Sequence, residues 1–183
     1  MQSFVQRMIG AAKLDVATYE EVEHDKSATW QAALVVVLAA IATGIGVMAG
    51  GSIQLFLMAA IAAIIGWLIW AAIIWLVGTK LLPEAQTEAD IGQLLRTLGF
   101  ASSPGLLRVL GFIPVIGGLV FMVVQIWMLI TMVIAVRQAL DYHSTWRAIG
   151  VCLIGWVVQL MIVWLLGGAA GLGGGGGASA PPV

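Results

Sequence analysis

The sequence predicts an all-α membrane protein, a polytopic bundle of transmembrane helices with short amphipathic helices before it. Of the 183 residues, 61% are hydrophobic and 9% are charged, whereas soluble domains carry about 25% charged residues. The mean hydropathy is +1.06. Residues 27–79, 109–136 and 148–183 contain no Asp, Glu, Lys, Arg or His. Such stretches exceed the ~20 apolar residues that a helix needs to cross the hydrocarbon layer.

The remaining composition excludes several other classes of protein. The chain contains eight Lys and Arg residues and nine Asp and Glu residues, which gives a net charge of -1. A protein that binds nucleic acid through a large basic field is therefore excluded, and we expect no nucleic-acid partner. A single cysteine, Cys152, excludes an intrachain disulfide and a cysteine-based metal cluster.

The first 27 residues are mixed in character and predict two short helices in a cytoplasmic polar segment. In the first, apolar residues recur at helical spacing, and Arg7 lies off their face. This helix lies either on the membrane surface or against the protein's own spans. The apolar residues are Phe4, Val5, Met8, Ile9 and Ala12. The second helix falls within residues 15–25, and Ser27 is the expected N-cap of the first span.

The apolar stretches predict the membrane spans in order. Glycines and a serine at 50–52 separate two spans in the longest stretch. The clear spans are 28–49, 53–77, 119–136 and 147–166. We therefore expect a transmembrane domain over 28–166, followed by a flexible Gly- and Pro-rich tail over 167–183.

The segment 92–113 decides between five spans and four. It contains Arg96 and Arg108, and Pro104 interrupts any continuous helix. Short cytoplasmic loops are enriched in Lys and Arg. If this segment crosses the membrane, all basic residues except Arg108 lie on the cytoplasmic side and the tail lies outside the cell. If it does not cross, Arg137 and Arg147 lie outside. The rule favours five spans, with four as the alternative.

Small residues in the first span indicate close helix packing. Gly46 and Gly50 have the GxxxG spacing, and Ala42 precedes them by one turn. Small side chains let helix backbones approach closely where lipid supplies no hydrophobic driving force. We expect this face to pack within the chain, with self-association as the alternative.

Arg108 is the most unusual residue of the apolar region, because a charge at the centre of a membrane helix costs ~2.5–3.5 kcal/mol. Our hypothesis is that a carboxylate or the carbonyls freed at Pro104 hold it on the cytoplasmic side of the bundle. Snorkelling to the headgroups is the alternative. Gln125 and Gln159 are expected to make hydrogen bonds between helices.

No motif supports catalysis, a metal or a cofactor. Glu21 and His24 form a Glu-x-x-His pair, but di-metal bundles need two such pairs, and His143 is the only other histidine. The sequence contains no nucleophile elbow, phosphate-binding loop or HExxH motif. We therefore expect a protein that is not an enzyme.

Four segments together resemble the Ypt/Rab-interacting protein (Yip) family, in its short prokaryotic form. They are KLDVATYEEVEHDKSATWQAALVV at 13–36, GWLIWAAIIWLVGTKLL at 66–82, LLRTLGFASSPGLLRVLGFIPVIGG at 94–118 and VRQALDYHSTWRAIGVCLIGW at 136–156. The resemblance implies five spans, a cytoplasmic N-terminus and an N-terminal polar segment. The family's eukaryotic members are associated with Rab-type GTPases and vesicle traffic, whereas its prokaryotic members have no settled activity.

The sequence and the resemblance together lead to one functional hypothesis and one rival. We expect a multi-pass protein of the cell membrane that acts as a non-catalytic scaffold, adaptor or membrane-organising subunit. Its expected partners are the lipid bilayer and membrane or cytoplasmic proteins, self-association included. The rival is a small transporter or channel component, in which Arg108 and the glutamines beside the break at Pro104 form a solute path.

Overall fold

The computed structural model describes residues 2–47 and 53–169, and within them all regular elements are helices. This confirms the predicted all-α class. The elements are α1 (Phe4–Ala12), α2 (Val16–His24), α3 (Ala28–Gly46), α4 (Ile53–Leu76), the π-helix η1 (Val77–Leu81), α5 (Ile91–Ala101), the 3-10 helix η2 (Ser103–Phe112), α6 (Gly117–Ala139) and α7 (Thr145–Ala169).

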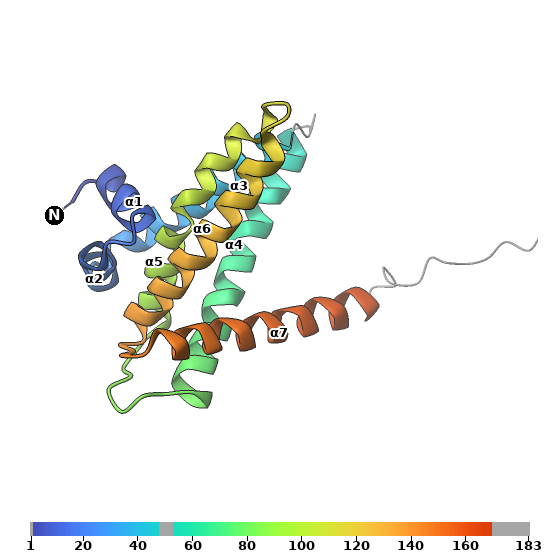
Figure 1. The fold of residues 1–183 in the computed structure, drawn as a ribbon. Coiled ribbons are helices and arrows are strands. Elements are labelled where there is room, and N and C mark those ends of the chain that lie inside the picture. The colour runs from blue at the N-terminus through green and yellow to red at the C-terminus, as the bar shows by residue number, and fades with distance from the viewer. Residues whose placement is uncertain (1, 48–52, 170–183) are drawn as a thin grey trace, which may run out of the picture.

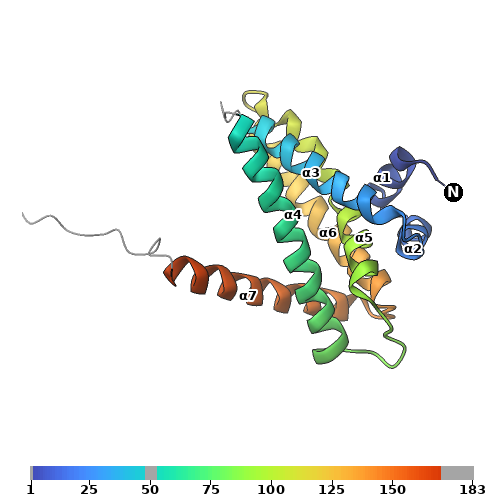
Figure 2. The same cartoon turned by 180° about the vertical axis from the view of Figure 1, so that it is seen from behind.

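A bundle of four apolar segments forms the body of the molecule (Figures 1 and 2). Helix α3 runs from the N-terminal hairpin to the far end of the bundle, and α4 runs back. Helices α5 and η2 then run together towards the far end, and α6 runs back again. Helix α7 then leaves at a steep angle and packs on α4 and α6. Beyond Trp156, exposed apolar side chains on it face outward, as a lipid-facing helix requires: Val157, Leu160, Met161, Trp164 and Leu165.

Four of the described helices are long and apolar enough to cross a membrane, namely α3, α4, α6 and α7. This number is consistent with the four-span alternative. The segment predicted as an additional span is a broken element: α5 ends at Ala101, and a 3-10 helix follows with Pro104 in its first turn. The break at Pro104 is confirmed, since proline has no amide hydrogen for the preceding turn. A fifth crossing stays a prediction.

The N-terminal hairpin, as we call α1 and α2 together, packs against the bundle. Tyr19 is fully buried, and its hydroxyl donates to the Ala11 carbonyl at 3.0 Å and approaches the Thr131 carbonyl of α6 at 3.4 Å. The indole of Trp127, also on α6, donates to the carbonyl of Ala12 at 2.7 Å. Of the two alternatives for the first helix, the structure shows packing against the protein itself.

Ser27 does not have the predicted capping role. Its side chain makes no hydrogen bond to the first turn of α3, and its backbone is helical. The hydroxyl instead donates to the carboxylate of Asp25. Ser27 is nevertheless the N-cap residue of α3 by position, so only the predicted role of its hydroxyl is wrong. A capping side chain reaches the first turn from extended backbone, whereas the backbone of Ser27 is helical.

Candidate functional site

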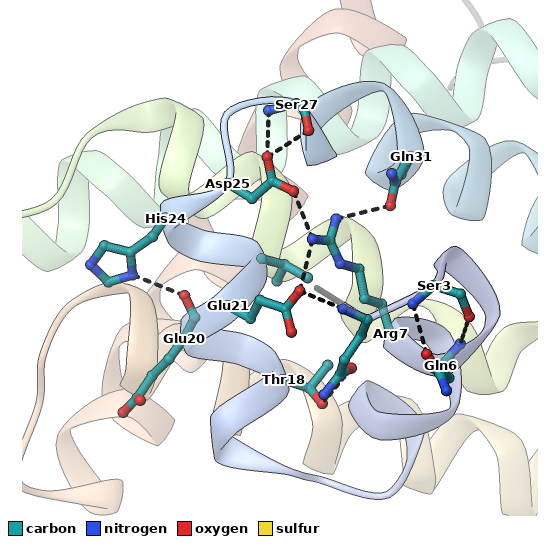
Figure 3. Close-up of polar contacts among 12 residues, drawn as sticks. Ser3, Gln6, Arg7, Thr18, Glu20, Glu21, His24, Asp25, Ser27 and Gln31 are labelled. Carbon is teal, nitrogen blue, oxygen red and sulfur yellow. Dashed lines mark hydrogen bonds and ion pairs between the residues drawn. The ribbon is translucent and has the colours of Figure 1, made fainter.

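The densest polar cluster is centred on Arg7, on the inner face of the N-terminal hairpin (Figure 3). Only 2% of the Arg7 side chain is exposed. Its Nη2 donates to Glu21 Oε1 at 2.9 Å and to Asp25 Oδ2 at 2.6 Å, and its Nη1 donates to Gln31 Oε1 at 3.1 Å. One guanidinium therefore joins α1 to α2 and to the first turn of α3.

The local sequence explains why Arg7 points inward. Ser3 and Gln6 form a reciprocal capping box that determines where α1 begins. Phe4, Arg7 and Ala11 then share one face of the helix. Phe4 packs edge-to-face on Phe100 of α5 with 6.3 Å between ring centroids, and Ala11 is fully buried. The expectation that Arg7 lies off the packed face is therefore wrong.

The two carboxylates around Arg7 are held in their charged form. The hydrogen bond from Arg7 is the main cause that lowers the pKa of Glu21, and the Gln2 amide adds to it. For Asp25, the hydrogen bond from the Ser27 hydroxyl lowers the pKa most, followed by that from Arg7. Two ionised partners compensate the charge of this buried cation, which is typical of a structural clamp, although its Nε has no acceptor among the described residues.

A second arginine binds the C-terminal end of α2 in the hairpin. The Nε of Arg96, on α5, donates to the carbonyls of Val22 at 3.0 Å and Glu23 at 2.9 Å, and its Nη2 also contacts the Glu23 carbonyl. These carbonyls belong to the last turn of α2, where helices leave acceptors unpaired and favour a positive charge. Arg96 thus caps α2 from a helix about 70 residues away in sequence.

The Glu23 side chain lies at the same junction, with 4% exposure. Its Oε1 accepts a hydrogen bond from the Gln93 amide at 3.0 Å. Burial raises the pKa of Glu23 to about 7, and the negative charge of Asp141 adds to this effect. The arginine beside it is engaged with backbone carbonyls, so the carboxyl group receives little compensation for its charge.

A third polar contact joins the loop before α5 to the connection between α6 and α7. Glu84 Oε2 accepts the backbone N–H of His143 at 3.0 Å, and Glu84 Oε1 lies 3.3 Å from Arg147 Nε. The backbone N–H of His143 is the main cause that lowers the pKa of Glu84. Tyr142 donates to the carbonyls of Gly78 and Leu82 at 2.9 and 2.8 Å. The start of α7 is thereby attached to η1 and to the loop that follows it.

Three of the residues singled out in the sequence lie together at the other end of the bundle. Arg108 Nη2 donates to Gln125 Oε1 at 2.6 Å, and the guanidinium lies 6.0 Å from the centroid of the Phe121 ring. A Cβ on Gly46 would collide with the backbone carbonyl of Arg108. Gly46 therefore permits the close approach of α3 to η2, which is the role predicted for a small residue in this span.

The hypothesis for Arg108 needs a correction. Its partner is the neutral amide of Gln125, and within residues 2–47 and 53–169 neither a carboxylate nor a carbonyl at the Pro104 break accepts a hydrogen bond from it. Arg108 lies at the end of α3 remote from the N-terminal hairpin, since it abuts Gly46, and the side of the membrane on which it lies stays a prediction. The reason is the break itself: η2 continues away from Pro104 towards that end of the bundle, and Arg108 is carried along.

The other predicted residues are dispersed. Pro104 is buried in the first turn of η2. Gln159 lies on α7, and its Oε1 is buried without a hydrogen-bond partner among the described residues. Gly50 lies outside the described residues. The Glu21 and His24 pair is split, because the Glu21 carboxylate binds Arg7 and the His24 Nδ1 lies 2.9 Å from the Glu20 carbonyl.

Sequence reasoning missed Arg7, Arg96 and Glu23 as the central residues of the polar junctions. For Arg7 a signal existed, since Phe4, Arg7 and Ala11 share one helical face and acidic residues are dense between 20 and 25. For Arg96 no local signal exists, because its acceptors are backbone carbonyls of a distant helix.

Comparison with known proteins gives a single match. The family model described as "Yip1 domain" matches residues 15–167. This range begins before α2 and ends within α7, so it includes the Arg96 junction and the whole apolar bundle, whereas α1 with Arg7 lies before it. Neither the curated proteins nor the solved structures provide a match.

Proposed function

Because the chain belongs to the Yip1 domain family, we propose that this multi-pass membrane protein is a non-catalytic scaffold or adaptor that organises protein partners at a membrane. The observation that supports this most is the clamped N-terminal hairpin. Arg7, Arg96 and Tyr19 attach it to α3, α5 and α6. A polar surface held rigidly beside a membrane bundle is suited to recognition, since little conformational entropy is lost on binding.

The use of the ionisable groups also supports a structural role. The carboxylates of Glu21 and Asp25 compensate Arg7, and Glu84 binds the start of α7. Arg96 is occupied by two backbone carbonyls. These groups hold helices together, whereas a catalytic acid or base needs access to a substrate.

The proposed contact surface is the exposed side of the N-terminal hairpin together with the segments 80–90 and 137–147. On the hairpin, Lys13 and Glu20 are exposed. On the other two segments, His143 is 83% exposed and forms the rim of a shallow depression with Gln86 and Asp141. In this proposal the polar segment spans 1–27 and the transmembrane domain 28–166. Of the predicted tail 167–183, the first three residues belong to α7, and residues 170–183 lie outside the described residues.

Quantitative co-purification tests the scaffold role. The full chain would be purified in mild detergent from its native membrane, as parent and with Lys13→Glu plus Glu20→Lys on the hairpin. Met58→Leu, at a position 67% exposed on α4, is the matched control. We expect specific partners, further copies of this chain included, to be lost from the hairpin variant and retained by the control. Equal recovery from all three proteins would contradict the proposal.

We also propose that the protein resides in the cell membrane with its N-terminus in the cytoplasm and its C-terminal tail outside. The basic residues at 7, 13, 26, 80 and 96 support this orientation. Reporter fusions at both ends test it. A cytoplasmic signal from the N-terminal fusion alone is expected for five crossings, and a cytoplasmic signal from both ends would establish an even number.

The alternative is a small transporter or channel component. The specific observation in its favour is the broken segment of α5 and η2, which places Arg108 against Gln125 of α6. Broken helices form the substrate sites of many transporters. Solute flux into liposomes that contain the purified protein tests it: a flux that Gln125→Leu abolishes would favour the transporter, and an absence of flux would favour the scaffold.

A further inference from the structure

Arg108 is a cation with no counter-charge at its own end of the bundle among the residues placed by the structure. Every one of the nine acidic side chains lies within residues 15–25, within 84–90 or at 141. The structure places these segments in the N-terminal hairpin and at the end where α4 finishes and α7 begins. Arg108 lies at the opposite end, where its backbone abuts Gly46. The undescribed residues 48–52 and 170–183 contain no Asp or Glu.

The hydrogen-bonding capacity of Arg108 is also largely unused. A guanidinium has five N–H donors. Nη2 donates to the neutral oxygen of Gln125, whereas Nε is buried and has no acceptor among the described residues. An arginine in an apolar environment needs further acceptors, because unsatisfied donors in hydrocarbon cost several kcal/mol each.

The surroundings of Arg108 are those of a lipid-facing surface. Its neighbours Leu107 and Leu110 are both 41% exposed, and Met122 and Ile126 on α6 are 55% and 52% exposed. Arg108 lies four residues before the end of η2, which corresponds to ~8 Å at the rise of a 3-10 helix. A long arginine side chain can cover such a distance and reach the headgroup layer.

We propose that Arg108 binds the phosphate of a phospholipid headgroup, in the leaflet at the end of the bundle where α3 finishes. The phosphodiester supplies both the missing negative charge and the acceptor oxygens, which match the forked guanidinium. Gln125 and the Phe121 ring hold the guanidinium in place, and the exposed leucines of η2 contact the acyl chains. The site is independent of whether the chain is a scaffold or a transporter.

Native mass spectrometry of the full chain in mild detergent tests the site. The probe is dioleoyl phosphatidylglycerol, added to the delipidated parent and to Arg108→Leu. Lys26→Gln, which removes one exposed positive charge outside the proposed contact surface, is the matched control. We expect Arg108→Leu to weaken binding of one lipid about tenfold, equivalent to ~1.4 kcal/mol, and the control to bind as the parent does. Equal binding by Arg108→Leu would overturn the proposal.

A second measurement uses only the parent protein and therefore does not depend on the variant folding. Dioleoylglycerol has the same acyl chains and no phosphate. The phospholipid is expected to raise the melting temperature of the delipidated protein, and dioleoylglycerol is not. Inorganic phosphate at millimolar concentration should give no shift, since it lacks the acyl chains. Equal stabilisation by dioleoylglycerol would overturn the proposal, and equal stabilisation by inorganic phosphate would overturn the choice of lipid as the source of the anion.

Discussion

Arg7 and Arg108 present the same physical problem at two places in the molecule, and the chain solves it differently. Around Arg7, Glu21 and Asp25 supply two carboxylates within hydrogen-bonding distance. Around Arg108, the only hydrogen bond goes to the uncharged Gln125 among the residues the structure describes. The comparison indicates that the first arginine is compensated by the chain itself and that the second depends on its surroundings.

Removal of Arg7 should have the largest effect. In Arg7→Ala, the carboxylates of Glu21 and Asp25 would remain partly buried without their cation, which typically costs ~3–5 kcal/mol. We expect a large loss of thermal stability of the purified protein and faster proteolysis of the hairpin. Lys13→Ala, at an exposed position on the same hairpin, should leave both unchanged. A parent-like melting temperature for Arg7→Ala would show that the hairpin is not clamped.

The next largest effect is expected at Gly46, which brings α3 against η2 beside Arg108. The methyl group of Gly46→Ala would collide with the Arg108 carbonyl, and overpacking of this kind costs ~1–3 kcal/mol. Gly66→Ala on α4 is the matched control, since a Cβ there meets nothing within 4 Å. Thermal unfolding in detergent should separate the two variants, and equal melting temperatures would exclude the close contact.

Docking of the hairpin should depend on pH through Glu23. Its pKa is about 7 in the docked state against an ordinary value of 4.5. Because the docked state binds the proton more tightly, docking is most stable below pH ~4.5 and weakens as the pH rises through 7. Hydrogen exchange of α2 amides should therefore be faster at pH 8 than at pH 5, after correction for the intrinsic rate. Glu23→Gln should abolish this difference, and a difference that persists would assign it to another group.

The smallest effect is expected for Arg108 in lipid-free detergent, which sharpens the comparison with Arg7. Arg108→Leu loses one hydrogen bond to a neutral amide and leaves no carboxylate unpaired. Hydrogen bonds between membrane helices are worth ~0.6 kcal/mol on average, so we expect a fall in melting temperature well below that of Arg7→Ala. A loss as large as that of Arg7→Ala would reveal a compensating group within the chain.

The outcome for particular residues shows how much the sequence could predict. The break of 92–113 at Pro104 was predictable because it follows from the missing amide of one residue. The role of Gly46 as a contact residue was predictable in kind, since small residues mark close helix packing. Its partner, the carbonyl of Arg108, was not, because nothing in either segment specifies which helices meet.

The sequence by itself determined the class of protein, because stretches without charge are stable only in an apolar environment and this depends on each residue alone. It also determined membership of the Yip1 domain family, which rests on an extended pattern of residues. Tertiary structure alone decided how charges are compensated. Arg96 caps a helix about 70 residues away, Arg7 faces inward, and Arg108 lies against Gly46, at the end of the bundle opposite to the described Asp and Glu residues. These facts depend on distances between helices, which packing sets and local sequence does not encode.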